Sequence, residues 1–221
     1  MQNVGAYGQE VSQTIASVRA LDLRSGEFVD IAAENCGFAY RRSIFNGTQR
    51  GRYIVSAVRY SLVKGATSAV NYADLKRYFQ DRPCHPSLSE VVAAVREIRR
   101  SKGMLLVEGD PDCSSAGSFF KNPVVSEQVF ARIAGQSATP VPHYDAGPRM
   151  VKIPAAWLLE YAGFSKGYAL GRAGISSRHT LALINRGGAS AEDVLALRDK
   201  ILEAVESRFG IRLEPEPVFV S

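Results

Sequence analysis

The segment Ser115–Pro123, with the sequence SAGSFFKNP, gathers residue types that can do chemistry into one short stretch. Ser118 offers a hydroxyl, Lys121 a cation, and Asn122 both a donor and an acceptor. Gly117 permits backbone conformations that are closed to other residues, or a close approach by another molecule. The segment therefore predicts either a tight turn with an aromatic anchor or a loop that contacts a ligand.

Two other places could carry charge-based chemistry. Arg41 lies among aromatic and aliphatic residues in Tyr40–Phe45, where a guanidinium group needs a partner and a carboxylate matches its fork. Glu216 lies between Pro215 and Pro217, which hold the chain rigid on both sides of its carboxylate. Each place also has a structural interpretation, which is an internal salt bridge for Arg41 and a solvated tail for Glu216.

The composition is that of an ordinary globular protein, with 221 residues, 46% of them hydrophobic, and a net charge of +5. No apolar run approaches the roughly 20 residues that span a bilayer, and the start lacks a signal-peptide pattern, so we expect no membrane partner. The three cysteines are widely spaced, which predicts no disulfide framework and a reducing, cytoplasmic compartment. The three histidines have no ligand spacing, so no metal is predicted.

The densest basic cluster is Arg96, Arg99, Arg100 and Lys102, at the end of a predicted helix. Such residues are favoured at a helix C-terminus. A small anionic ligand such as a nucleotide diphosphate fits them as well as a polymer does. Because no aromatic residues interleave with this cluster, we expect no nucleic acid partner.

The predicted elements that position these residues include both strands and helices, without a regular alternation of the two, which predicts an α+β fold. A capping box at Ser87 and Glu90 predicts the start of a helix that continues through Ile98. The segment Lys64–Ser68 is the expected domain boundary, which gives domains 1–66 and 67–221. We expect a long loop at 136–149, further helices at 126–135, 154–163 and 191–209, and strands at 17–23, 27–31, 53–63, 180–185 and 213–220.

No standard nucleotide-binding, hydrolase or metalloprotease motif is present. From end to end and in register, however, the chain resembles the family of UDP-N-acetylenolpyruvoylglucosamine reductases (UDP-N-acetylmuramate dehydrogenases, MurB), the flavoenzymes of peptidoglycan precursor synthesis. The motifs that carry the resemblance are, in order, Gln2–Glu10, Tyr40–Phe45, Ser115–Pro123, Ile153–Leu158, Asn185 and Leu213–Glu216.

The resemblance implies that FAD is reduced by NADPH and passes a hydride to the enolpyruvyl ether of a UDP-sugar substrate. Charge then builds up beside the substrate carboxylate, where preorganised donors stabilise it. By family role, Arg41 and Glu216 would serve this stabilisation. Ser118 would deliver a proton to the adjacent carbon, which a weak acid can do only towards a strongly basic intermediate.

The same resemblance implies binding roles for other residues. Tyr72, Lys102 and Asn122 would position the substrate, with Lys102 near its diphosphate. The residues expected to contact FAD are Asn3, Gly5, Ala6, Tyr7 and Gly8.

The chain also departs from the family pattern. We expect it to begin inside a FAD-binding second domain, so that residues 1–66 are the remainder of that domain and residues 67–221 form the substrate-binding and catalytic domain. The FAD site is then incomplete, and a separate or missing N-terminal FAD-binding segment is an expected partner. The segment Gly103–Ser114 is also longer than the connection common in the family.

Two hypotheses follow. The first is a catalytic, NADPH-dependent FAD oxidoreductase, and the second is a truncated, non-catalytic remnant that at most binds the UDP-sugar.

Overall fold

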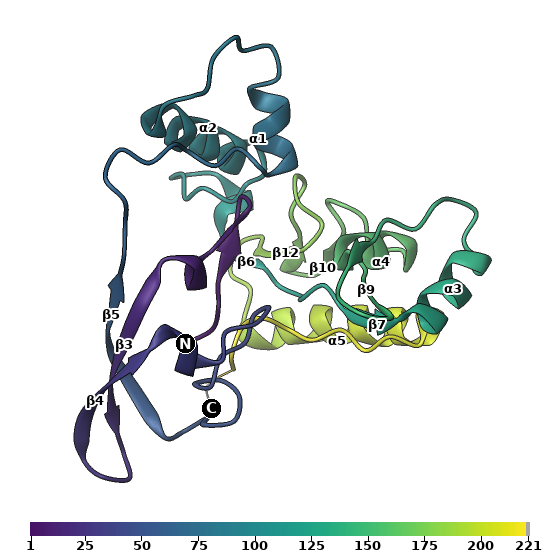
Figure 1. Ribbon diagram of the computed structural model, residues 1–221. Helices are drawn as coiled ribbons and strands as arrows, with labels where there is room; N and C mark the ends of the chain where they lie inside the picture. The colour runs from purple at the N-terminus through teal and green to yellow at the C-terminus, as the bar shows by residue number, and fades with distance from the viewer. Residues whose placement is uncertain (220–221) are drawn as a thin grey trace. The chain divides into compact units, whose positions relative to one another are not determined.

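The computed structural model describes residues 1–219, and the chain divides into two compact units, Met1–Arg96 and Glu97–Ser221. Figure 1 shows strands and helices in both. The predicted α+β class is therefore confirmed. The predicted domain boundary after residue 66 stays a prediction, since the division into compact units falls later, within a helix.

The first unit is built on a three-stranded antiparallel sheet with the order β4-β3-β5. Strands β3 (Ile15–Asp22), β4 (Glu27–Ala32) and β5 (Tyr53–Tyr60) match the predicted strands within a few residues. Val18 and Ala20 of β3 face a small core, because alternate residues of a strand point to the same face, and Ile15 reaches the same core across a register shift between Ile15 and Ser17. That core contains Ile15, Val18 and Ala20, together with Cys36 and Phe45.

Short elements surround this sheet. A small hairpin, β1 (Gly5–Ala6) and β2 (Gln9–Glu10), is followed by a 3-10 turn η1 (Val11–Gln13), and a second turn η2 (Ala33–Cys36) follows β4. Helix α1 (Ala73–Tyr78) carries no apolar repeat long enough to predict from sequence.

Helix α2 (Leu88–Ser101) begins at the predicted capping box. The Glu90 carboxylate accepts hydrogen bonds from the backbone N–H of Ser87 at 2.8 Å and from the Ser87 hydroxyl at 2.6 Å. This exchange satisfies groups that a helix start otherwise leaves without partners. The division between the two units falls within this helix, between Arg96 and Glu97.

The second unit contains two antiparallel sheets. The larger has the order β10-β11-β12-β6, and its members are β6 (Ser115–Ser118), β10 (Ala169–Leu170), β11 (Ala173–Ile175) and β12 (Ala182–Asn185). The smaller has the order β7-β9-β8, with β7 (Val124–Ser126), β8 (Tyr144–Asp145) and β9 (Met150–Lys152).

Three helices and a 3-10 turn complete this unit. They are η3 (Pro111–Cys113), α3 (Glu127–Gln136), α4 (Ala155–Tyr161) and α5 (Ala191–Phe209). The apolar stripe predicted for the last helix is confirmed, because Leu197, Ile201, Val205 and Phe209 of α5 are buried. They join one core with the buried faces of the larger sheet and of α4. The long helix α5 is the yellow-green element of Figure 1.

Three sequence expectations were incomplete. Ser115–Ser118 forms strand β6 rather than a turn, and β8 lies inside the predicted loop 136–149. The strand predicted at 213–220 is reduced to a single bridge between Phe120 and Pro215, and Val220 lies outside the described residues. A proline lacks the N–H that a continuous strand ladder requires, and Pro215 and Pro217 both fall in this segment.

Candidate functional site

The first group of site residues lies in the first unit, around the β1–β2 hairpin. The Arg41 guanidinium donates a hydrogen bond from Nη2 to the carbonyl oxygen of Gly5 at 3.1 Å. A Cβ atom at Gly5 would lie 3.0 Å from Cγ of Glu10 and 3.4 Å from Nη1 of Arg41, so glycine permits this close packing. Arg41 has a φ of 54°, an uncommon conformation for a residue with a side chain. Arg41 and the hairpin are therefore one packed assembly.

Tyr72 joins the same assembly at the tip of the hairpin. Its ring meets the ring of Tyr7 edge to face, with centroids 5.4 Å apart. A Cβ atom at Gly8 would lie 3.3 Å from the backbone nitrogen of Tyr72. Tyr7 and Gly8 form the two-residue turn, and both have positive φ, 53° and 83°. Three predicted site positions thus meet at one turn.

Asn3 is buried and supports the hairpin through both ends of its amide. Its Nδ2 donates to Oε2 of Glu10 at 2.7 Å, and its Oδ1 accepts from the backbone nitrogen of Ser12 at 3.2 Å. The side chain is therefore committed to the fold of the loop. Ala6, Gly8 and Gln9 are the exposed positions of the hairpin.

The second group lies in the second unit, where β6 continues into a backbone-paired segment. The Phe119 carbonyl accepts from the backbone nitrogen of Glu216 at 2.8 Å, and the Lys121 nitrogen donates to the Glu214 carbonyl at 2.9 Å. The Glu216 backbone thus pairs directly with the residue that follows Ser118. The solvated-tail interpretation of Glu216 is wrong, since the residue is half-buried and its backbone is paired.

Ser118 ends strand β6, opposite Ala182 of β12. Its side chain is half-buried, and within residues 1–219 its hydroxyl makes no hydrogen bond. The preceding Gly117 has a φ of 80°, and no atom lies within 4 Å of the position that a Cβ would take there. The Ser118 hydroxyl is therefore held by a strand and remains available to a ligand.

Lys121 and Asn122 use part of their bonding capacity within the chain. The Lys121 ammonium forms an ion pair with Glu214 at 2.5 Å. Oδ1 of Asn122 accepts from the backbone nitrogen of Ala155 at 2.8 Å, which satisfies an N–H at the start of α4. The Asn122 amide nitrogen is the part of this side chain left for a ligand.

Lys102 follows the last residue of α2, and the structure adds two basic groups to its surroundings. Burial, followed by the charges of Lys102 and Lys166, lowers the pKa of His179. Nδ1 of His179 accepts from the backbone nitrogen of Leu181 at 3.2 Å, so its other ring nitrogen is the one that carries hydrogen. The charges of both lysines thus reach His179, and their positive charge suits an anionic ligand.

The sequence predicts no metal site at His179, and it does not single out Lys166. The Leu181 hydrogen bond gives His179 a structural role within the second unit. The sequence offers no signal that these residues influence one another, because a long folded segment separates Lys102 from Lys166 and His179.

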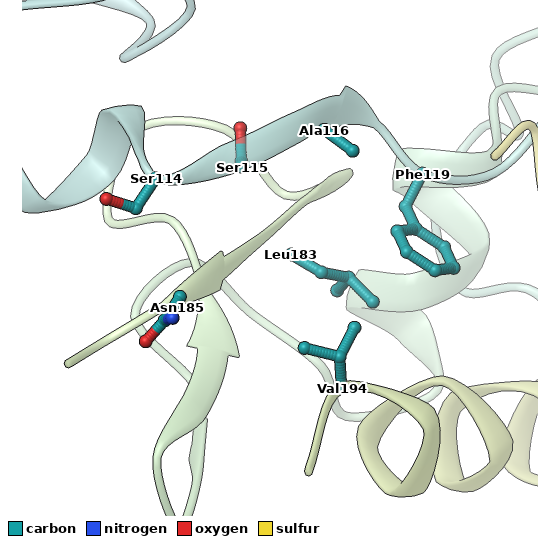
Figure 2. Close-up of a pocket in the computed structure, with 7 residues that line it drawn as sticks. All are labelled: Ser114, Ser115, Ala116, Phe119, Leu183, Asn185 and Val194. Carbon is teal, nitrogen blue, oxygen red and sulfur yellow. The ribbon is translucent and has the colours of Figure 1, made fainter. Parts of the chain in front are cut away.

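A pocket of about 410 Å³ opens beside β6 in the second unit. Figure 2 shows its lining, with Ser114, Ser115 and Asn185 on one side and apolar side chains on the other. The apolar lining residues are Ala116, Phe119, Leu183 and Val194. The pocket and Ser118 thus share one strand.

Among residues 1–219, no group of three or more histidine, cysteine, aspartate or glutamate residues could hold a metal ion. In the same range, every helix is too short or too polar to cross a bilayer.

Comparison with known proteins begins with the fold. The crystal structure of UDP-N-acetylenolpyruvylglucosamine reductase (MurB) from Thermus caldophilus matches 97% of this chain and 56% of its own chain, with a TM-score of 0.53. The sequence identity is 24%, so this likeness shows the fold alone.

The sequence comparisons are closer. UDP-N-acetylenolpyruvoylglucosamine reductase of Thermobifida fusca is 46% identical over the whole chain, which spans 64% of that relative. The Mycobacterium tuberculosis H37Rv protein of the same name is 42% identical, and the chain spans 62% of it. The chain thus covers less than two thirds of these relatives.

A family profile described as the C-terminal domain of UDP-N-acetylenolpyruvoylglucosamine reductase matches residues 110–220, which is half of the chain. The chain belongs to the UDP-N-acetylenolpyruvoylglucosamine reductase (MurB) family. Ser118, Asn122 and Glu216 lie inside the matched range, whereas Arg41, Tyr72 and Lys102 precede it.

Proposed function

We propose that this chain carries substrate-binding and proton-donating residues for the reduction of UDP-N-acetylglucosamine enolpyruvate to UDP-N-acetylmuramate, with FAD as cofactor and NADPH as reductant. This is a step of peptidoglycan precursor synthesis in the cytoplasm. Family membership supports the reaction. The observation that carries the proposal is the pairing of Glu216 with Phe119, directly beside an available Ser118 hydroxyl.

The proton chemistry falls to Ser118. When FAD is bound, it supplies a hydride to one carbon of the enolpyruvyl double bond, and the adjacent carbon must then gain a proton. The Ser118 hydroxyl donates that proton, because an enolate-like carbon is basic enough to take it from a weak acid. A loss of this donor lowers the rate by roughly 10²–10⁴-fold, the usual contribution of a positioned proton donor.

Glu216 and Arg41 have the proposed role of stabilising developing charge. A carboxyl group stabilises negative charge only as a hydrogen-bond donor, whereas a guanidinium does so with a permanent positive charge. The rigid pairing of residues 214–216 with 119–121 supports this role for Glu216, since preorganised donors are the effective ones. For Arg41, the bond to the Gly5 carbonyl fixes the guanidinium.

The substrate contacts that we propose are Lys102, Asn122 and Tyr72. Lys102 and Lys166 lie near a neutral His179 donor, which suits the diphosphate of a UDP-sugar. Asn122 would offer its amide nitrogen, since its Oδ1 already accepts from Ala155. Tyr72 would contribute from the hairpin tip, where Tyr7 fixes its ring.

The proposed flavin contacts are Asn3, Gly5, Ala6, Tyr7 and Gly8. They fit one strip of a flavin site, because the exposed turn has little side-chain bulk at Ala6 and Gly8. Asn3 would act indirectly, since both ends of its amide support the hairpin.

A second candidate function is binding of the UDP-sugar without flavin chemistry. The observation that favours it is the internal use of the flavin-contacting residues. Asn3, Gly5 and Gly8 are each explained by packing or hydrogen bonds within the first unit. On this alternative the chain is a non-catalytic module.

Two measurements on the purified chain separate these functions. If it binds FAD, the protein will be yellow after dialysis, and NADPH will bleach the flavin. A colourless protein that UDP-N-acetylglucosamine still protects from proteolysis would establish the binding module. A colourless protein that gains no protection from the ligand would contradict both functions.

If the chain is active, Ser118→Ala should still allow bleaching by NADPH while substrate reduction slows by roughly 10²–10⁴-fold. The matched control is Ser207→Ala, which removes a hydroxyl from an exposed position of α5 and should keep full activity. Full turnover by Ser118→Ala would remove Ser118 from the mechanism.

A further inference from the structure

The segment that joins α2 to β6 is fixed by one arginine. The Arg178 guanidinium donates from Nε to Asp112 at 2.8 Å and from Nη2 to both carboxylate oxygens of Asp110 at 2.5 Å. From Nη1 it donates to the carbonyl oxygen of Arg100 at 3.1 Å. One side chain thus bonds two positions of the segment Gly103–Ser114 and the last turn of α2.

The carboxylate of Asp112 completes this cluster. It also accepts from the backbone nitrogen of Ser177 at 3.0 Å and from the Ser177 hydroxyl at 2.7 Å. The Asp112 side chain is 9% exposed and that of Arg178 is 29% exposed, so both ions are partly shielded from water. Charge-assisted bonds with several partners in such a setting hold geometry more firmly than a single surface ion pair does.

Gly103 shows how tightly the segment is packed. A Cβ atom there would lie 2.9 Å from Cβ of Asp112 and 3.2 Å from Nε of Arg178. Its φ of 65° also favours glycine. The chain therefore turns directly against the arginine in the position that follows Lys102.

Lys102 lies directly before Gly103, and backbone hydrogen bonds fix the chain on both sides of it. Its backbone nitrogen donates to Ile98 at 3.2 Å, and the next two nitrogens donate to Arg100 and Arg99. Arg178 is also directly followed by His179, the residue on which the Lys102 charge acts. From His179 the path to the β6 strand is short, because the His179 carbonyl accepts from Ala182, which lies opposite Ser118.

We propose that Arg178 is a positioning residue for Lys102, holding the end of α2 so that the lysine can bind the diphosphate of a UDP-sugar. This inference rests on the substrate role proposed above for Lys102. Arg178 itself makes no contact with the substrate in this proposal. A planar fork is required, because three of its nitrogens bond to three different residues, and a lysine cannot reproduce that pattern.

The test uses Arg178→Lys, which keeps the charge, and Arg132→Lys as its control. Arg132 also bonds a carbonyl at a helix C-terminus, that of Phe209 at 2.8 Å, but at the end of α5. Calorimetry would measure binding of UDP-N-acetylglucosamine and of uridine, which lacks the diphosphate. We expect Arg178→Lys to weaken binding of the UDP-sugar about 10-fold (~1.4 kcal/mol) and to leave uridine binding unchanged. Arg132→Lys should change neither.

A double-mutant cycle decides whether the effect passes through Lys102. Lys102→Met alone should weaken UDP-sugar binding at least as much as Arg178→Lys, and the double variant should be no weaker than Lys102→Met. Additive losses, or an equal loss of uridine binding, would overturn the positioning role.

Amide hydrogen exchange tests the inference without any ligand. In Arg178→Lys, exchange at Lys102, Gly103 and Met104 should become about 10-fold faster, while Arg132→Lys should leave it unchanged. Unchanged exchange in Arg178→Lys would overturn the positioning role even if the chain binds UDP-sugar. Faster exchange in a chain that fails to bind UDP-sugar would contradict the proposed function of Lys102, and with it the purpose assigned to Arg178.

Discussion

The two groups of site residues are held by different kinds of contact. In the first unit, Arg41 and the hairpin are joined by side-chain contacts, and Tyr7 and Arg41 adopt positive φ. In the second unit, Ser118 and Glu216 are placed by backbone pairing. Because backbone hydrogen bonds do not depend on side-chain identity, Ser118 and Glu216 can be substituted without a change in the backbone around them. Substitutions around Arg41 should disturb their neighbours.

The contrast has a functional consequence. A strand-held hydroxyl is preorganised before any ligand arrives, which is the condition under which a proton donor is effective. The hairpin instead depends on side-chain contacts, among them the Tyr7–Tyr72 ring pair, the Arg41 bond to Gly5 and the two hydrogen bonds of the Asn3 amide. We therefore expect ligand binding to order the first group more than the second.

The largest expected effect is on the second group. Phe120 is 2% exposed and lies in the backbone-paired segment between Ser118 and Asn122. Phe120→Ala should lower the free energy of unfolding by about 3–5 kcal/mol, because it leaves a cavity in the core. The single tryptophan, Trp157, lies in α4 of the same core, so its fluorescence during denaturant titration reports this unit.

The control for this prediction is Phe219→Ala. Phe219 is 53% exposed and contacts the ring of Phe119 from the surface. Its loss should cost less than about 1 kcal/mol, as for surface contacts in general. Equal losses for the two phenylalanines would show that backbone pairing, rather than core packing, carries the stability of this segment.

The next prediction concerns the hairpin. Gly8→Ala and Gly26→Ala both place a side chain at positive φ, 83° and 74°, which costs roughly 1–2 kcal/mol. Only at Gly8 would the new Cβ meet Tyr72, at 3.3 Å from its nitrogen, since nothing lies within 4 Å at Gly26. Gly8→Ala should therefore cost more, by up to about 1 kcal/mol, through the disturbed Tyr7–Tyr72 ring pair.

Amide hydrogen exchange of residues 1–96 measures this difference, because the tryptophan reports the other unit. Gly26→Ala controls for backbone strain alone. Equal effects of the two substitutions would mean that the hairpin tip does not depend on Tyr72, and the packed assembly of the first unit would then be looser than its contacts indicate.

Substitutions of Asn122 can distinguish its contribution to the stability of the second unit from its proposed contribution to ligand binding. Asn122→Ala removes the acceptor for the Ala155 nitrogen and should cost about 1 kcal/mol, measured by Trp157 fluorescence. Asn122→Asp keeps an acceptor there and should be close to the parent in stability. Both variants should weaken binding of UDP-N-acetylglucosamine, since both lose the amide donor. Parental affinity in Asn122→Asp would exclude the proposed amide contact.

The sequence predicted best what local patterns determine. The apolar period of 191–209 and the Ser87–Glu90 capping box each gave the correct helix. The β6 strand was missed, because its pairing with β12 is a long-range contact that glycine and serine do not signal. The hydrogen bond from Arg41 to the Gly5 carbonyl was not predicted either, because the residue types around Arg41 favoured a carboxylate partner. No spacing rule foretells a bond between residues so far apart in sequence.

In the candidate site, too, the sequence predicted what is local and missed what depends on distant residues. The segment Ser115–Pro123 stood out by residue type alone, because few folds need that mixture. The surroundings of Lys102 did not, since Lys166, Arg178 and His179 come from distant parts of the chain. Residues that act through others are found only after the chain is folded.

The smallest predicted effect concerns an acidic residue in the first turn of a helix, one in each unit. The Ser87 hydroxyl, and then Arg82, lower the pKa of Glu90 at the start of α2 to about 2. In α5 of the second unit, hydrogen bonds from Ser190 lower the pKa of Asp193. A carboxyl whose folded pKa is depressed stabilises the fold above its unfolded pKa, near 4.5 for Glu90, and the contribution disappears as pH falls towards 2.

Glu90→Gln should therefore be less stable than the parent at neutral pH, and the difference should shrink as pH falls from about 4.5 towards 2. Amide exchange in α2 measures this, and salt should weaken the effect because the Arg82 pair is exposed to solvent. Ser87→Ala removes the main cause of the shift, so its loss of stability with acid should be smaller and should be complete at a higher pH than in the parent. Asp193→Asn should produce the corresponding change in α5 while leaving α2 unaffected. If Glu90→Gln instead altered exchange in both helices, the first and second units would unfold together. The two groups of site residues would then differ in local geometry but not in the free energy of unfolding of their units.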